Sequence, residues 1–205
     1  MNVIITIGRE YGSGGKYIGE LVSKKLGIPF YDKNILTKAY EKNKCDYSKL
    51  EENDEKNKSE ILKNLEMFNM NNYKDNGIYS SDVYQSIISD TIVDIANHGS
   101  CVILGRNANN ILKGKNNVIN IFIYSNNLDF KIRRKMKLND VSYEETKKQL
   151  KIIDKQRKKY YESINKGHIW GSIRDYDYCI DSSLLGVDKT ADMLVDIYNN
   201  LLKKK

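Results

Sequence analysis

The chain has 205 residues, a length that suits one domain with a sizeable hydrophobic core. Hydrophobic residues make up 40% of it and charged residues 30%, which is typical of a soluble globular protein. No apolar run approaches the ~20 residues of a membrane span, and the first one stops at Gly8, so we expect neither a membrane anchor nor a secretory signal. Three widely spaced cysteines without a CxxC pair argue against a disulfide framework or a zinc site, and we expect a cytoplasmic protein.

The formal net charge is +7, and part of it lies in basic blocks at residues 131–137 and 155–159 and in the lysines at 203–205. A nucleic-acid-binding surface could use this charge, and so could a site for two polyphosphate ligands. A glycine-rich segment near the N-terminus favours phosphate ligands. We therefore expect small-molecule partners and keep nucleic acid as a distant alternative.

Short apolar runs alternate with longer amphipathic ones, which predicts an α/β fold with a parallel sheet covered by helices on both faces. In chain order, strands are expected at residues 3–7, 28–31, 101–104, 118–124 and 178–181. Helices are expected at residues 15–26, 33–42, 81–97, 127–137, 142–164 and 187–202, the first of them closed by Gly27. Residues 43–77 are dominated by Asp, Glu, Asn and Lys, which indicates an inserted segment within a single domain.

The first predicted strand runs into a glycine-rich turn, residues 8–16 (Gly-Arg-Glu-Tyr-Gly-Ser-Gly-Gly-Lys), that opens the first helix. Glycine lets backbone N–H groups approach an anion, the helix N-terminus adds the positive end of its dipole, and a lysine supplies a full charge. The turn therefore predicts a phosphate cradle, and a tight turn without a ligand is the alternative. The candidate ligand-binding residues are Gly12, Ser13, Gly14, Gly15, Lys16 and Tyr17.

The strict phosphate-binding pattern, G-x-x-x-x-G-K-[ST], is not satisfied when Lys16 is taken as its lysine. Glu10 then stands in the place of the first glycine, and Tyr17 in the place of the Ser or Thr that would hold magnesium. The motif alone leaves open whether the site turns over a substrate, and no residue is assigned as a metal ligand.

Three polar residues follow predicted strands. Arg106 lies at the carboxyl edge where open α/β sheets bind ligands, and it can grip a phosphate bidentately or form a surface ion pair. Asp32 follows the second strand, where an aspartate often serves as the N-cap of the next helix. Asp181 ends the last strand and is either an ordinary turn residue or one that faces a ligand.

These segments together resemble the bacterial cytidylate kinase-like family, which belongs to the P-loop nucleoside monophosphate kinases. The similar residues are Ile5 to Lys16, Leu26 to Asp32, Gly105-Arg106, residues 154–161 and residues 180–183. The resemblance covers nearly the whole chain and implies a three-layer P-loop NTPase fold with a mainly parallel five-stranded sheet. It also implies a helical acceptor-binding insert, here residues 43–77, and a lid near residues 140–175. The resemblance is poorest at 43–77, where these kinases build acceptor specificity.

The resemblance also implies roles for individual residues. Lys155 and Arg157 match the cationic positions of a lid that closes over the transferring phosphate, and Asp154 matches its carboxylate. The acceptor nucleotide would lie beside Asp32 and Arg106, with Arg133 or Arg134 from the preceding helix. Asp181 belongs to a segment that resembles the loop against the donor base.

We therefore expect an ATP-dependent kinase that uses Mg²⁺ and phosphorylates a nucleoside monophosphate, with CMP or dCMP as the best candidates. The loop amides and Lys16 would hold the donor phosphates with help from Ser13, and Lys155 and Arg157 would supply further catalytic charge. Two alternatives stay open: a nucleotide-binding regulatory protein of the same fold without turnover, and a P-loop kinase for another small phosphate acceptor.

Overall fold

The computed structural model describes residues 2–32, residue 35 and residues 81–203, so the predicted insert at 43–77 and nearly all of the predicted helix at 33–42 lie outside the described residues. Five strands form one sheet in the order β2-β3-β1-β4-β5, and every neighbouring pair is parallel. The strands are β1 (Ile4–Arg9), β2 (Phe30–Tyr31), β3 (Cys101–Leu104), β4 (Val118–Tyr124) and β5 (Tyr178–Asp181). All five strands that the sequence predicts are present.

The helices also follow the predicted order. They are α1 (Gly15–Leu26), α5 (Ser81–His98), α6 (Ala108–Ile111), α7 (Leu128–Asn139), α8 (Tyr143–Ile164), α9 (Ser182–Leu185) and α10 (Val187–Lys203). The sequence did not predict α6 and α9, because a helix of four residues is too short to show a 3.6-residue period. Strand β1 begins one residue later than predicted and ends two residues later, because Gly8 and Arg9 continue the pairing with β4.

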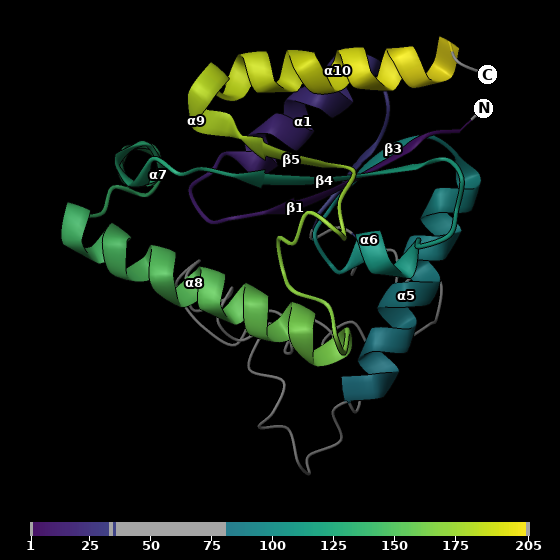
Figure 1. Cartoon of the computed structure of the whole chain (residues 1–205), viewed down its shortest axis with the longest axis horizontal. Helices are drawn as coiled ribbons and strands as arrows, with labels where there is room; N and C mark the ends of the chain where they lie inside the picture. The colour runs from purple at the N-terminus through teal and green to yellow at the C-terminus, as the bar shows by residue number, and fades with distance from the viewer. Residues whose placement is uncertain (1, 33–34, 36–80, 204–205) are drawn as a thin grey trace.

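Helices cover both faces of the sheet, which makes three layers (Figure 1). On one face, Ile5 and Ile7 of β1 pack with α1 and α10 in a cluster that includes Ile18 and Leu194. On the other face, Ile4 of β1 packs in a second cluster with residues of β3, α5 and α6. Successive side chains of a strand point to opposite faces, so neighbouring residues of β1 enter different cores. The α/β three-layer expectation is confirmed.

Helix α1 begins and ends at glycines that adopt left-handed backbone conformations. Gly14 at its start has φ 89°, and Gly27 at its end has φ 65° and donates its N–H to Ser23 O. In the middle of the helix, a Cβ on Gly19 would lie 2.9 Å from the Phe30 ring, so glycine lets α1 approach β2 closely. These contacts fix the position of the helix N-terminus at the end of β1.

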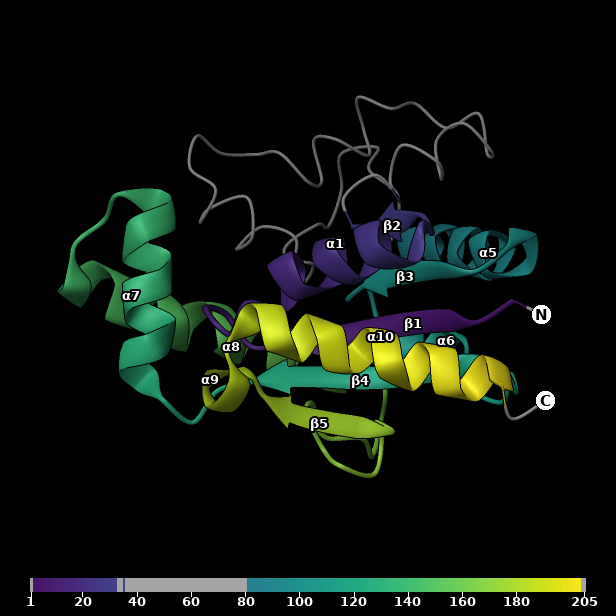
Figure 2. The ribbon, with the colours of Figure 1, turned by 90° about the horizontal axis from the view of Figure 1, so that it is seen from above.

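The carboxyl ends of β1, β3, β4 and β5 lie at one edge of the sheet, because the strands are parallel. Figure 2 shows α7 and the start of α8 beyond this edge, next to α9. Residues that the sequence singles out are therefore brought to one end of the molecule from distant parts of the chain. In the part of the chain that the structure describes, no helix is long and apolar enough to cross a membrane.

Replacing Ile5 by alanine should lower the free energy of unfolding by about 2–5 kcal/mol, because the side chain is fully buried and its removal leaves a cavity. Ile173→Ala is the matched control, since that isoleucine is 79% exposed, and its effect should stay within about 0.5 kcal/mol. Urea denaturation of both variants measures the difference. Equal effects would contradict the assignment of Ile5 to the core.

Candidate functional site

The turn between β1 and α1, residues 10–14, is built around two glycines that no other residue could replace without strain. Gly12 has φ 82°, and a Cβ there would lie 2.8 Å from Lys131 Cβ. Gly14 has φ 89°, and a Cβ there would lie 2.5 Å from Val187 Cγ1. No side chain caps α1 at Gly14, so the first backbone N–H groups of this helix are available to a ligand.

Ser13 lies buried between these glycines and stiffens the turn. Its hydroxyl donates to Glu10 O at 2.9 Å, and its carbonyl accepts from Ser182 Oγ at 2.6 Å. The Ser13 side chain is therefore occupied within the protein. Its contribution to a ligand would come through its backbone.

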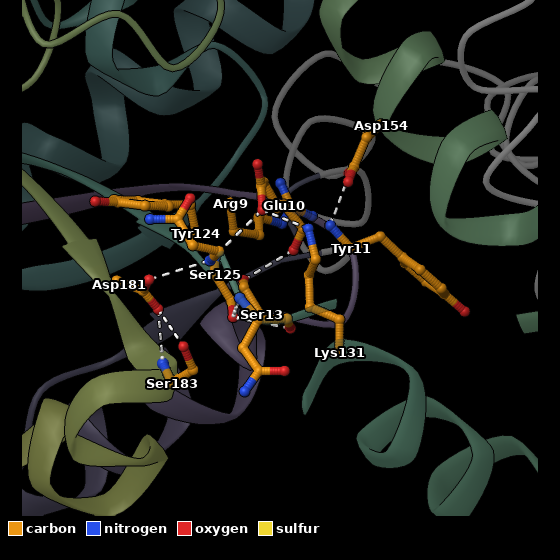
Figure 3. A network of polar contacts seen from close by, with 12 residues as sticks. Arg9, Glu10, Tyr11, Ser13, Tyr124, Ser125, Lys131, Asp154, Asp181 and Ser183 are labelled. Atoms are coloured by element: carbon orange, nitrogen blue, oxygen red, sulfur yellow. Dashed lines mark hydrogen bonds and ion pairs between the residues drawn. The ribbon is translucent and has the colours of Figure 1, made fainter. Parts of the chain in front are cut away.

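Helix α7 is tied to the turn through Glu10 (Figure 3). The Glu10 carboxylate accepts from Lys131 Nζ at 2.9 Å and from the backbone N–H of Ser125 at 3.2 Å. When the phosphate-binding pattern is aligned with Lys16 as its lysine, Glu10 occupies the position of the first glycine. Its side chain joins the turn to β4 and α7.

Helix α8 is tied to the opposite side of the turn. Asp154 accepts from the backbone N–H of Tyr11 at 2.7 Å, as Figure 3 shows. Arg157 donates to Arg9 O at 3.2 Å and forms an ion pair with Asp154 at 3.5 Å. A small hydrophobic cluster of Tyr11, Ile132, Leu150 and Ile153 packs behind these polar contacts.

Arg9, Arg106 and Arg157 repel one another beside this turn. Burial, followed by repulsion from Arg157, lowers the pKa of Arg9 to about 9, although Asp32 and Asp154 act in the opposite direction. Burial also lowers the pKa of Arg157, against the attraction of Asp154. Buried cations that lie close enough to repel one another form an arrangement that an anionic ligand stabilises.

The environment of Asp154 disfavours the ionised form of its carboxylate. Burial raises its pKa from 3.8 to about 6, and repulsion from Glu10 adds to this, while Arg157 and the Tyr11 N–H favour the charged form. The carboxylate therefore titrates closer to neutral pH than an ordinary aspartate.

Arg106 lies in a strained turn at the end of β3. Gly105, Arg106 and Asn107 adopt three successive left-handed conformations with φ 71°, 55° and 60°. Two of them are not glycine, and such a conformation costs about 1–3 kcal/mol each unless its surroundings impose it. Paired hydrogen bonds between Asn107 and Asn165, at 2.7 and 3.1 Å, hold the turn to the end of α8. Arg106 itself is only 9% exposed.

Adjacent arginines on α7 point in different directions. A Cβ on Gly14 would lie 3.4 Å from the Arg134 guanidinium carbon, so Arg134 lies against the turn. Its Nε is buried without a hydrogen-bond partner, and burial lowers its pKa. Arg133 is exposed and acts electrostatically on Tyr143, away from the turn. Of the two predicted alternatives, the structure brings Arg134 to the turn.

The remaining predicted residues divide in the same way. Asp32 is near the turn, with Oδ2 3.6 Å from Lys16 Nζ. Lys16 is 58% exposed and also lies 3.9 Å from Glu20. Lys155 is exposed on α8, and Tyr17 is 44% exposed with its hydroxyl 3.2 Å from Asp188 of α10. Lys155 is thus not brought to the turn with the others, whereas the Tyr17 ring centroid lies 5.8 Å from the guanidinium carbon of Arg134, which itself lies against the turn.

Asp181 serves as the N-cap of α9. Its carboxylate accepts from the N–H and hydroxyl of Ser183 and from the N–H of Asn126. Burial opposes ionisation, but these hydrogen bonds outweigh it and lower the pKa of Asp181. The structure therefore gives Asp181 the turn role that the sequence left open, with its carboxylate oxygens already bonded.

The residues present do not form an obvious magnesium site. Lys16 and Tyr17 offer no small hydroxyl at the start of α1, and the Tyr17 hydroxyl turns toward Asp188. Among the described residues, no group of three or more His, Cys, Asp or Glu side chains could hold a metal ion.

Sequence reasoning missed Arg9, Glu10 and Lys131, which are part of the network around the turn. Arg9 directly precedes the turn, and its position at the end of a buried strand was a usable signal. The pairing of Glu10 with Lys131 joins residues 121 positions apart and leaves no local signal in the sequence.

The parallel sheet and the glycine turn between β1 and α1 define a protein of the P-loop kinase type. The sequence matches the model of the cytidylate kinase-like family over residues 4–184, and the chain belongs to that family. No curated protein matches the chain.

Two solved structures are similar over nearly their whole length. An uncharacterized protein from Eubacterium ventriosum ATCC 27560 has 27% sequence identity and a TM-score of 0.70, with 96% of this chain and 98% of that one covered. Shikimate kinase from Bacteroides thetaiotaomicron has 12% identity and a TM-score of 0.53, covering 97% and 99%. At that identity the second similarity concerns the fold alone, which it identifies as the P-loop kinase fold.

Replacing Asp154 by asparagine should flatten the pH dependence of stability between pH 4 and pH 6. The folded protein, with a pKa of about 6, holds this proton more tightly than an ordinary aspartate at 3.8. The group therefore favours the folded state below pH 4, and this contribution is lost as the pH rises through 6, by at most ~3 kcal/mol. Urea denaturation across this range measures it.

The exposed Asp196→Asn on α10 is the matched control for this experiment and should keep the wild-type profile. An Asp154→Asn profile parallel to that of the wild type would contradict the raised pKa.

Proposed function

We propose that this protein is an ATP-dependent nucleoside monophosphate kinase, with CMP or dCMP as the first candidates for the acceptor. The observation that carries the proposal is that Arg134 of α7 and Arg157 of α8 lie against the start of one glycine turn or its glycines, while Arg106, just after β3, acts electrostatically on Arg9 next to that turn. Phosphoryl transfer requires positive charge around the transferring group and little other chemistry from the protein. Membership of the cytidylate kinase-like family supports the same reaction class.

In this proposal the donor phosphates lie against the backbone of residues 12–15 and the N-terminus of α1. The acceptor nucleotide lies beside Asp32, after β2, with its phosphate toward Arg106, after β3. The acceptor phosphate is already anionic, so the reaction needs no general base. The protein contributes positioning and electrostatic stabilisation of the transition state.

Residues 140–175 are proposed to act as the lid over this site. The contacts that would close it are those of α8 with the turn, from Asp154 to the Tyr11 N–H and from Arg157 to Arg9 O. Both contacts involve backbone atoms next to the predicted donor phosphates. Closure would therefore bring the Arg157 charge to the transferring group and exclude water from it.

Residues 43–77 are proposed to form the acceptor-binding insert, the segment in which these kinases build acceptor specificity. A nucleotide-binding protein without turnover remains the second candidate. The observation that favours it is the absence of a small hydroxyl at positions 16 and 17.

Purified protein with Mg-ATP should release ADP when CMP or dCMP is added, and release less with the other nucleoside monophosphates. Coupled ADP detection with each monophosphate in turn measures this preference. ATP-dependent thermal stabilisation without turnover would favour the regulatory protein. If ATP causes neither turnover nor thermal stabilisation, the result would contradict a nucleotide site in this protein.

Arg157→Met should lower kcat by roughly 10²–10³-fold and change the KM for ATP by much less, because a lid cation acts mainly in the transition state. Lys158→Met, at the next position of α8, is the matched control: Lys158 is exposed and pairs with Glu162 at 3.9 Å. It should leave both constants nearly unchanged. Equal losses in kcat and in ATP affinity for Arg157→Met would contradict the lid role.

A further inference from the structure

Arg9 fills the space that a side chain at residue 15 would need. A Cβ on Gly15 would lie 2.6 Å from Arg9 Cβ and 3.1 Å from Arg9 Cγ. Both distances are too short for ordinary carbon–carbon contact. An arginine at position 9 and a side chain at position 15 therefore exclude each other.

This contact identifies a second register for the phosphate-binding pattern. In G-x-x-x-x-G-K-[ST] the first glycine precedes the lysine by six positions, which is the separation of Arg9 and Gly15. Gly14 then stands in the place of the second glycine. In this register Arg9 occupies the position of the first glycine of the pattern, and Gly15 occupies the position of its lysine.

In the alternative register, the residues at the first-glycine and lysine positions are Glu10 and Lys16, and these two residues bind different partners. Glu10 pairs with Lys131 and with the Ser125 N–H, at the side of α7. Lys16 pairs instead with Asp32 and Glu20. The two residues thus have separate partners, whereas Arg9 and Gly15 are in direct contact.

The Arg9 guanidinium extends from the turn toward the end of β3. A Cβ on Gly105 would overlap Arg9 Nη1, so the guanidinium lies against the residue that precedes Arg106. It is thus situated between the turn and Arg106. Within residues 2–32, 35 and 81–203, no carboxylate lies within ion-pair distance of Arg9. Its side chain keeps some exposure to solvent, so a ligand can reach it.

We propose that Arg9 supplies the phosphate-binding cation of this turn, and that Gly15 is the small residue that makes room for it. The inference rests on the proposed function in one respect, namely that the ligand carries a polyphosphate. A guanidinium offers a fork of donors, so Arg9 would bind two phosphate oxygens where a lysine binds as a point charge. Lys16, which the sequence favoured for this task, instead neutralises Asp32 and Glu20.

The steric part of the inference can be tested without a ligand. Gly15→Lys alone should lower the urea midpoint of unfolding, because the new side chain meets Arg9. Adding Arg9→Gly should recover a substantial part of this loss, and the double variant has the sequence G-x-x-x-x-G-K at residues 9–15. If the losses of stability of the two single variants simply add in the double variant, positions 9 and 15 are not coupled, and the steric part of the inference is overturned.

The ligand part is tested by titrating the folded proteins with tripolyphosphate and with ATP, using thermal shift and calorimetry. Arg9→Met should weaken tripolyphosphate binding by about tenfold or more, and Arg9→Lys should weaken it less. Lys24→Met, at an exposed position farther along α1, is the matched control and should change binding by less than about threefold, and Lys16→Met should weaken binding less than Arg9→Met does. The Arg9→Gly, Gly15→Lys double variant should bind more tightly than Arg9→Gly alone.

The outcomes separate this inference from the proposed function. Wild-type binding of tripolyphosphate that depends on Arg9, without turnover of any monophosphate, would keep the inference and reject the kinase. Unchanged binding by Arg9→Met, or loss of binding by Lys16→Met alone, would overturn the role of Arg9. A double variant that is folded but binds no better than Arg9→Gly would overturn it as well. Wild-type protein that binds neither ligand would overturn both.

Discussion

The structure depends on holding several cations close to a turn in which two positions, Gly12 and Gly14, carry no side chain. The turn is clamped from two sides, by Lys131 of α7 through Glu10 and by Asp154 of α8 through the Tyr11 N–H. Gly12 and Gly14 are required in the turn because a Cβ at these positions would meet Lys131 of α7 or Val187 of α10. The β1–α1 turn is therefore rigid before a ligand arrives, which reduces the ordering that binding must supply.

This rigidity is combined with an electrostatic imbalance. Burial lowers the pKa of Arg9, and Arg157 and Arg106 lower it further by repulsion, while Asp32 and Asp154 act in the opposite direction. The lowered pKa of Arg9 and the raised pKa of Asp154 are two consequences of the same burial. A bound polyphosphate would supply the missing negative charge, so a site that is unfavourable when empty becomes favourable when filled.

The sequence predicted the order of strands and helices because each element carries its own periodicity and its own glycine or polar boundary. It could not distinguish Arg133 from Arg134, because the choice depends on how α7 is rotated against the turn. It did not reveal Glu10 and Lys131 as partners, because their contact joins segments 121 residues apart. What remained unpredictable was the pairing of side chains across elements, since tertiary packing alone decides it.

Arg9 illustrates a more specific limit of pattern matching. A motif assigns the charge to a position in the sequence, but phosphate binding requires only that the charge reach a position in space. A guanidinium on a long, flexible stem at the end of β1 can reach the space beside Gly15 and Gly105, provided that both residues lack a side chain. The glycines at 15 and 105, which come from separate segments, are then explained by one neighbour. An apparently degenerate loop can in this way retain the physical parts of a phosphate site.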